Sequence, residues 1–146
     1  EDEVSGKLSF NMGILEGDAD HLTVKINYRY PVTKTYEDCA PKLTETFKKA
    51  GFELTSEEHK GALYVDEKTP YVQTLLDVYH EMTGLTGGAM SIGGGTYAKA
   101  IPNIVAFGPI FPGDTVREHL PNEFWEIEIL MKNAQIYAEA MYRLAK

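Results

Sequence analysis

The sequence predicts a mixed α/β protein, with an α+β portion followed by an α/β portion, and three patterns support this. Residues 7–15 and 22–30 alternate apolar and polar side chains, as half-buried β-strands do. The continuous apolar run 104–107 is typical of a strand buried on both faces. Apolar side chains recur at helical spacing over about 123–145, which predicts a long amphipathic helix.

The two alternating runs are expected to pair as an antiparallel hairpin. Turn residues lie between them at Gly17–Asp20, and Pro31 ends the second run because proline cannot donate to a strand ladder. The first strand should place four apolar side chains on one half-buried face, namely Leu8, Phe10, Met12 and Ile14.

A helix is expected over about 36–50, ended by Gly51. If Asp38 is its N-cap, Pro41 falls in the first turn, where the missing N–H costs little. The strand, strand and helix together suggest half of an α+β lobe.

The composition changes near residues 66–70, and we place a domain boundary there, between 1–67 and 68–146. Thr69 is expected to cap a second helix with Pro70 at its first position, and Gly84 should end that helix. Further short strands are expected at 52–54, 62–65, 89–92 and 104–107.

Composition excludes some classes of function. The net charge is −8 and basic residues do not cluster, so the chain is a poor candidate for binding nucleic acid. The single cysteine, Cys39, cannot form an internal disulfide, and no apolar run is long enough to cross a membrane. Glu1 begins neither a signal peptide nor an initiator methionine sequence, so the chain is expected to start within a longer protein.

A glycine run, Gly93–Gly95, is the first candidate binding element. Glycines let backbone N–H groups approach a ligand closely, and Thr96 and Tyr97 add hydroxyl groups; the alternative is a tight strand-to-helix connection. The run is not a phosphate-binding loop of the Walker type, because no Lys-Ser or Lys-Thr follows it, and it is not a dinucleotide-binding fingerprint.

His119 is the candidate metal ligand, because a neutral imidazole binds metal ions; the alternative is a solvated or capping histidine. Asn122 is a suitable N-cap for the last helix, and Glu123 would orient the imidazole or favour the helix dipole. The other three histidines show no ligand spacing with one another or with Cys39, and they are interpreted as surface residues: His21, His59 and His80.

Arg29 lies on the polar face of its strand, where a guanidinium could hold a carboxylate in a bidentate contact; the alternative is an ordinary exposed arginine. Two acidic clusters, Glu57-Glu58 and Glu126/Glu128, are interpreted as solvated surface.

Together, five segments in this order resemble the C-terminal third of the bacterial Xaa-His (carnosinase-like) dipeptidases of the zinc aminoacylase/carboxypeptidase superfamily. The segments are Asn27–Pro31, Gly93–Ala98, Val105–Gly108, His119 with Asn122-Glu123, and Ile136–Ala140. The resemblance runs across nearly the whole chain, and the glycine loop followed by the histidine is its specific part.

The resemblance implies a metallopeptidase of two lobes, with 1–67 as the end of a lid domain and 68–146 as the end of a catalytic domain. It implies that Arg29 grips the substrate's terminal carboxylate and that Gly94, Gly95 and Thr96 hold the substrate backbone. His119 would be one ligand of a site with two zinc ions, with manganese as a possible substitute. The reaction implied is metal-assisted hydrolysis of a dipeptide in the cytoplasm.

The family's His-x-Asp pair, Glu-Glu pair and further aspartate have no counterpart here, because Glu57-Glu58 lies in the lid portion. The chain alone is therefore expected to be inactive and to need the missing N-terminal part of the same protein as a partner. Homo-oligomers are also expected, because the truncated sheet would expose apolar surface. Two alternatives stay open: a related N-acyl amino acid amidohydrolase or desuccinylase, and a non-catalytic binding or assembly module.

Overall fold

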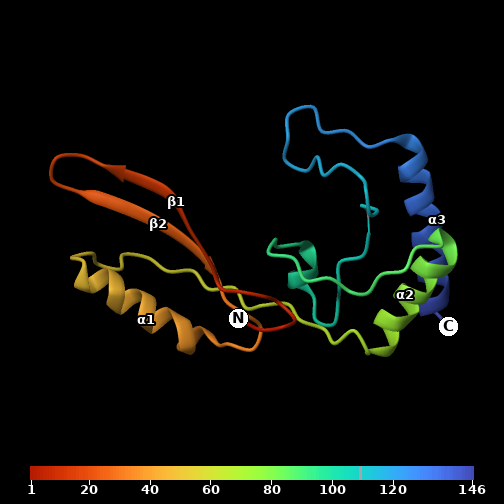
Figure 1. Ribbon diagram of the computed structural model, residues 1–146, viewed down its shortest axis with the longest axis horizontal. Helices are drawn as coiled ribbons and strands as arrows, with labels where there is room; N and C mark the ends of the chain where they lie inside the picture. Colours follow the sequence, from red (N-terminus) through yellow and green to blue (C-terminus); the bar gives the residue numbers. More distant parts are fainter. Residues whose placement is uncertain (109) are drawn as a thin grey trace. The chain divides into compact units, whose positions relative to one another are not determined.

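The computed structural model describes residues 1–108 and 110–146, and its elements are mixed, as predicted (Figure 1). The chain forms two compact units. The first consists of Glu1–Tyr64 with Ser91–Gly94, and the second of Val65–Met90 with Gly95–Lys146. The assignment of a lid to 1–67 and of a catalytic domain to 68–146 stays a prediction.

The first unit contains the predicted hairpin. Strands β1 (Ser9–Gly17) and β2 (Leu22–Arg29) pair in antiparallel fashion. The connecting turn is closed by Asp18, whose carboxylate Oδ1 accepts the backbone N–H of Asp20 and of His21, each at 2.9 Å. A short side chain that accepts nearby backbone donors is the reason aspartate favours such turns.

A β-bulge at Gly13 changes which side chains share a face of β1. Met12 pairs with Ile26 and Ile14 with Lys25, so Gly13 is left without a partner on β2. One unpaired residue shifts the following side chains to the opposite face. The prediction that Ile14 shares a face with Met12 is therefore wrong.

Burial of the hairpin is also lower than predicted. All of β1 is exposed, and only alternate residues of β2 are half-buried, namely Val24, Ile26 and Tyr28. The hairpin contacts the following helix through Phe10 and Phe47, whose stacked rings lie 6.2 Å apart. Phe52 meets the Phe47 ring edge-on at 5.8 Å.

Helix α1 (Tyr36–Lys49) has a different N-cap from the one predicted. Thr35, not Asp38, is the cap: its hydroxyl accepts the N–H of Asp38, and the Asp38 carboxylate accepts the N–H of Thr35. This capping box satisfies two donors at the start of the helix. Pro41 consequently lies inside the helix beyond the first turn, where its ring removes one backbone hydrogen bond. Gly51 follows with φ 90°, as a helix-ending glycine does.

The second unit is built on helices α2 (Pro70–Thr83) and α3 (Ile127–Leu144). Thr69 is at the N-cap position of α2 and Pro70 is the first helical residue, as predicted, but the Thr69 side chain makes no capping hydrogen bond. Gly84 ends the helix with φ 71°, as predicted. Helix α3 starts at Ile127, later than the expected 123. The two helices share an apolar core with one loop residue, and its buried members are Leu75, Val78, Phe111, Ile136 and Ala140.

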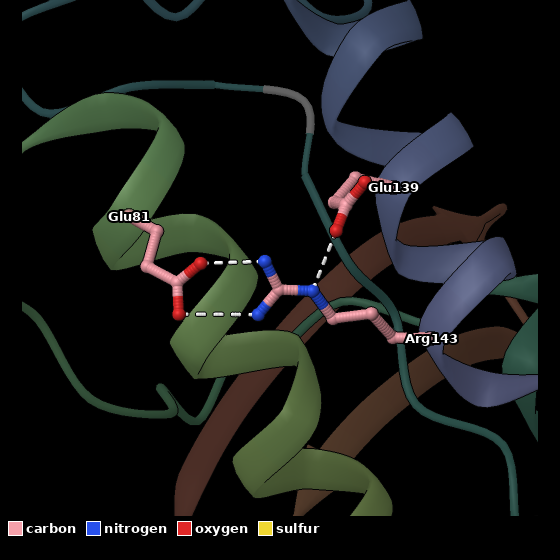
Figure 2. Close-up of polar contacts among 3 residues, drawn as sticks. All are labelled: Glu81, Glu139 and Arg143. Atoms are coloured by element: carbon pink, nitrogen blue, oxygen red, sulfur yellow. Dashed lines mark hydrogen bonds and ion pairs between the residues drawn. The ribbon is translucent and has the colours of Figure 1, made fainter. Parts of the chain in front are cut away.

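An ionic cluster also joins α2 to α3 (Figure 2). The guanidinium of Arg143 donates from Nη1 to Glu81 Oε1 at 3.1 Å and from Nη2 to Glu81 Oε2, while Nε donates to Glu139 at 2.6 Å. The two bonds to Glu81 are bidentate, the strong geometry for arginine and carboxylate. Hydrogen bonds to both carboxylates raise the pKa of Arg143, and the bond to Glu81 contributes most to this rise.

The four short strands predicted at 52–54, 62–65, 89–92 and 104–107 do not form. Across residues 1–108 and 110–146 the sheet consists of β1 and β2 alone. A strand needs a neighbour to bond with, and none of these runs finds one within the described part of the chain.

No helix among the described residues has the length and apolar character needed to cross a bilayer.

Candidate functional site

Arg29 is the last residue of β2 and lies opposite Ser9. Its side chain is exposed, on the face of the strand opposite to the half-buried Tyr28 and Tyr30. The guanidinium makes no hydrogen bond or ion pair with any described residue. A cation with five N–H donors is therefore available to an anionic ligand at the end of this strand.

The glycine run begins beside this arginine. Ser91–Gly94 belong to the same unit as the hairpin, and a Cβ added at Gly93 would lie 3.7 Å from Arg29 Cδ. Gly93, Gly94 and Gly95 do not have left-handed backbones, and at Gly95 an added Cβ would meet nothing within 4 Å. Local backbone geometry therefore does not explain why glycine occupies these positions. The absence of side chains there leaves room for a ligand to approach.

Thr96 caps a short 3₁₀-helix, η1 (Tyr97–Ala100). Its hydroxyl oxygen accepts the N–H of Ala98 at 3.1 Å, and the hydroxyl hydrogen stays available to a ligand. The side chain of Tyr97 is 96% exposed, so its phenol is free of packing in the described structure. Thr96 therefore starts this short helix, but no strand precedes it at 89–92, and its role in ligand binding stays a prediction.

His119 lies in a tight turn and is exposed. Its φ is 63°, an uncommon value for a residue with a side chain, and its N–H donates to Glu123 Oε2 at 3.3 Å. Leu120 donates its N–H to the carbonyl of Arg117 at 3.1 Å, which closes the turn. The guanidinium carbon of Arg117 lies 4.4 Å from the centre of the Phe124 ring.

Asn122 and Glu123 differ from their predicted roles. Asn122 does not cap the last helix, because α3 begins at Ile127 with Glu126 as its N-cap, and Asn122 has φ 58°. Asparagine tolerates this left-handed backbone better than most residues, which suits it to the turn. Glu123 contacts the backbone of His119, and no described hydrogen bond joins it to the imidazole.

The predicted site residues are divided between the two units. Arg29 and Gly94 belong to the first unit, and Gly95, Thr96 and His119 belong to the second. Within 1–108 and 110–146, no three His, Cys, Asp or Glu side chains are grouped closely enough to hold a metal ion. A single imidazole does not make a zinc site, so this chain by itself does not fit a complete metal centre.

The sequence did not reveal a cluster around His59. The His59 Nε2 lies 2.6 Å from the Tyr30 hydroxyl, and its ring is 4.6 Å from that of Tyr36. The Tyr36 hydroxyl donates to Glu57, and this hydrogen bond is the main reason that the pKa of Tyr36 is raised to about 12. His59 is at the surface, as predicted, but it joins the 53–64 segment to Tyr30, the residue that follows β2. No sequence spacing predicts a contact over 29 residues.

A second histidine also has a contact that its position did not reveal. His80, near the end of α2, places Nε2 at 2.7 Å from the Gly87 carbonyl. The Nε2–H tautomer would donate to that carbonyl. Nearby, Glu67 Oε1 would lie 2.9 Å from a Cβ added at Gly88. The His80 contact joins the end of α2 to the start of the glycine-rich segment within the second unit.

Comparison with known proteins gives the chain relatives of one kind. No protein-family model matches it. The chain is 41% identical over its whole length to "Putative dipeptidase YtjP" of Bacillus subtilis, of which it covers 31%. It is 34% identical to "Putative dipeptidase SH1171" of Staphylococcus haemolyticus and 32% identical to a "Putative dipeptidase" of Staphylococcus epidermidis, covering 30% of each. The chain therefore spans about 30% of the length of these proteins, which are named as dipeptidases. The similarity covers 97–100% of this chain.

Proposed function

We propose that this chain is the C-terminal part of a metal-dependent dipeptidase and supplies part of its substrate-binding surface. The observation that carries the proposal is the 41% identity over the whole chain to a protein named as a dipeptidase. The position of Gly93 beside Arg29 supports it, because two predicted binding elements meet there.

Arg29 would hold the terminal carboxylate of the dipeptide. Its guanidinium is exposed and bonds to no described residue, so no internal partner competes with a ligand. A guanidinium and a carboxylate fit each other in a planar, bidentate contact. This grip would select short peptides, because a longer chain places an amide where the carboxylate should be.

Gly94, Gly95 and Thr96 would hold the substrate backbone. Glycines present backbone N–H groups without a side chain in the way, and the Thr96 hydroxyl hydrogen is still available beside them. These donors suit the carbonyl oxygens of a peptide.

His119 would be one ligand of the metal centre. A zinc or manganese ion supplies an activated water for amide hydrolysis when it is bound, and such a site normally uses three protein ligands. The remaining ligands and the general base would belong to polypeptide outside this chain. We therefore expect the isolated chain to be inactive.

The decisive experiment compares substrates on the protein encoded by the complete reading frame. Hydrolysis of a dipeptide should be measured beside hydrolysis of the same dipeptide with its C-terminus amidated. An Arg29→Ala variant should lose most activity on the free dipeptide and little on the amide. Lys25→Ala is the matched control, because Lys25 is an exposed cation four residues earlier on β2.

The outcomes separate the candidate functions. Selective loss with Arg29→Ala supports the carboxylate grip, and equal loss on both substrates contradicts it. An N-acyl amino acid included in the same assay tests the amidohydrolase alternative. If the full-length protein hydrolyses neither class with zinc or manganese present, the enzymatic proposal is wrong and the binding module is favoured.

A further inference from the structure

Within the apolar run 104–107, residues 105–107 alternate in burial as a β-strand does, and Ile104 at its start is half-buried as well. Val105 and Phe107 pack against the core between α2 and α3, while Ala106 between them is exposed. Side chains that alternate with a period of two are characteristic of a strand lying on a helical layer. One face of this run is therefore covered by the second unit.

The backbone of this run is not paired. No N–H of residues 104–107 donates to a described residue, and the one described contact at a carbonyl is the Tyr137 hydroxyl, 2.9 Å from the Phe107 oxygen. Backbone groups in an apolar segment normally find partners, and unpaired strand edges attract another strand. The run therefore presents donors and acceptors that the described chain does not satisfy.

A shallow apolar groove of about 460 Å³ lies along the same run. Side chains from the run and from both helices line it, among them Leu75, Val105, Phe107, Ala140, Met141 and Leu144. Met141 is 66% exposed and Leu144 is 45% exposed, so a large part of this lining faces solvent. Covering it would remove apolar area from water, which favours docking of an apolar segment.

We propose that 104–107 is a strand of an incomplete sheet and that its partner is an apolar β-strand from the same polypeptide outside this chain. The relatives are long enough to supply it, since the chain covers only 31% of one and 30% of others. A strand fits better than a helix, because a helix bonds its own backbone groups and would leave those of 104–107 unpaired. The inference rests on the proposed function only in taking this chain as part of a longer protein.

Hydrogen exchange of the backbone amides tests this docking surface. The exchange rates of the peptide spanning 104–107 should be compared in the isolated chain and in the full-length protein. We expect exchange at least about a hundredfold slower in the full-length protein, because ladder amides are protected by the stability of the sheet. Equal, fast exchange in both would overturn the proposal.

Concentration dependence identifies the occupant. If the isolated chain shows the same protection, increasing with concentration, the partner is a second copy and the proposal is wrong. If protection appears only in the full-length protein, the proposal is supported. This result does not depend on hydrolysis: protection with no dipeptidase activity would sink the proposed function and leave the docking surface intact.

A matched pair of variants extends the test. Met141→Glu places a charge in the groove, and Met131→Glu places the same charge on an exposed methionine of α3 that does not line it. In the full-length protein, Met141→Glu should restore fast exchange at 104–107 and Met131→Glu should not. Equal effects of both variants, or of neither, would contradict a partner on this face.

Discussion

Different kinds of contact stabilise the interior of each unit. The second unit has buried apolar side chains on both helices, with Val78 fully buried and Ile136 3% exposed. The first unit has a two-stranded sheet whose apolar side chains stay largely exposed, with Met12 at 62% and Leu15 at 67%. Its helix and hairpin meet through the aromatic rings of Phe47 and Phe10 instead.

The difference follows from how many apolar layers each unit contains. A two-stranded hairpin is marginal by itself and needs a third strand or a packed helix to gain stability. The helix pair α2 and α3 already forms a small two-layer core. We therefore expect the second unit to resist unfolding better, and the following predictions test that contrast.

The largest effect is expected from Ile136→Ala. Removing a nearly buried isoleucine from the core leaves a cavity and should lower the free energy of unfolding by about 2–5 kcal/mol. Ile127→Ala is the matched control, since Ile127 begins the same helix and is 76% exposed. Denaturant titration followed by circular dichroism measures both, and similar losses in the two variants would contradict a localised core.

A smaller loss is expected from Gly108→Ala in the second unit. Gly108 has φ 73°, and a Cβ added there would collide with the Tyr137 hydroxyl. The strained backbone alone should cost about 1–3 kcal/mol. Gly95→Ala is the control, because an added Cβ there meets nothing. Adding Tyr137→Phe should recover part of the loss in thermal unfolding, and a Gly108→Ala variant as stable as the original would refute the clash.

Sequence reasoning succeeded where structure is local. The alternating runs, Gly51 and Gly84 located the hairpin and two helix ends, because strand periodicity and left-handed backbones act over a few residues. It missed the bulge at Gly13, since a glycine within an alternating run reads as one more strand residue. It also named Asp38 as the cap of α1 and did not consider Thr35, although both residue types suit that position.

The remaining errors concern contacts between distant segments. The run 104–107 has a strand pattern but no strand partner in the described chain, and pattern alone does not supply one. His59 and Tyr30, 29 residues apart, come together only once the hairpin has formed. For the candidate site, the sequence identified residue types, whereas the contact of Gly93 with Arg29 required coordinates.

A third prediction compares ion pairs in the two units. Arg143→Met removes the cluster that joins α2 to α3, and it should lower the melting temperature because two carboxylates lose their partner. Lys49→Met removes the exposed pair with Glu45 in α1, whose side chains are 74% and 65% exposed, and should change little. High salt should reduce the difference in melting temperature between the two variants. Equal, small shifts in both variants would show that the Arg143 cluster adds no stability.

The smallest effect is expected at the start of the first unit, where Asp2 joins the N-terminal segment to the turn that follows the hairpin. Its carboxylate accepts the Ser5 N–H first, then the Ser5 hydroxyl and both donors of Thr33, and these bonds hold the pKa of Asp2 well below its ordinary 3.8. A lowered pKa in the folded state stabilises the fold above pH 3.8, and that contribution is lost as the pH falls below it.

Amide resonances of Ser5 and Thr33, followed by NMR during acid titration, report this contact directly. Both should change together at a pH below 3.8 in the original chain. Asp2→Asn should remove the shared change, because the amide does not titrate, whereas Asp20→Asn should leave it, since the Asp20 carboxylate accepts no hydrogen bond from a described residue. The chemical shifts of the α2 amides should not change with Asp2→Asn. If the α2 resonances shifted together with that of Thr33, the two units would not be stabilised independently. The contrast between the apolar core of the second unit and the hydrogen bonds of Asp2 in the first would then be wrong.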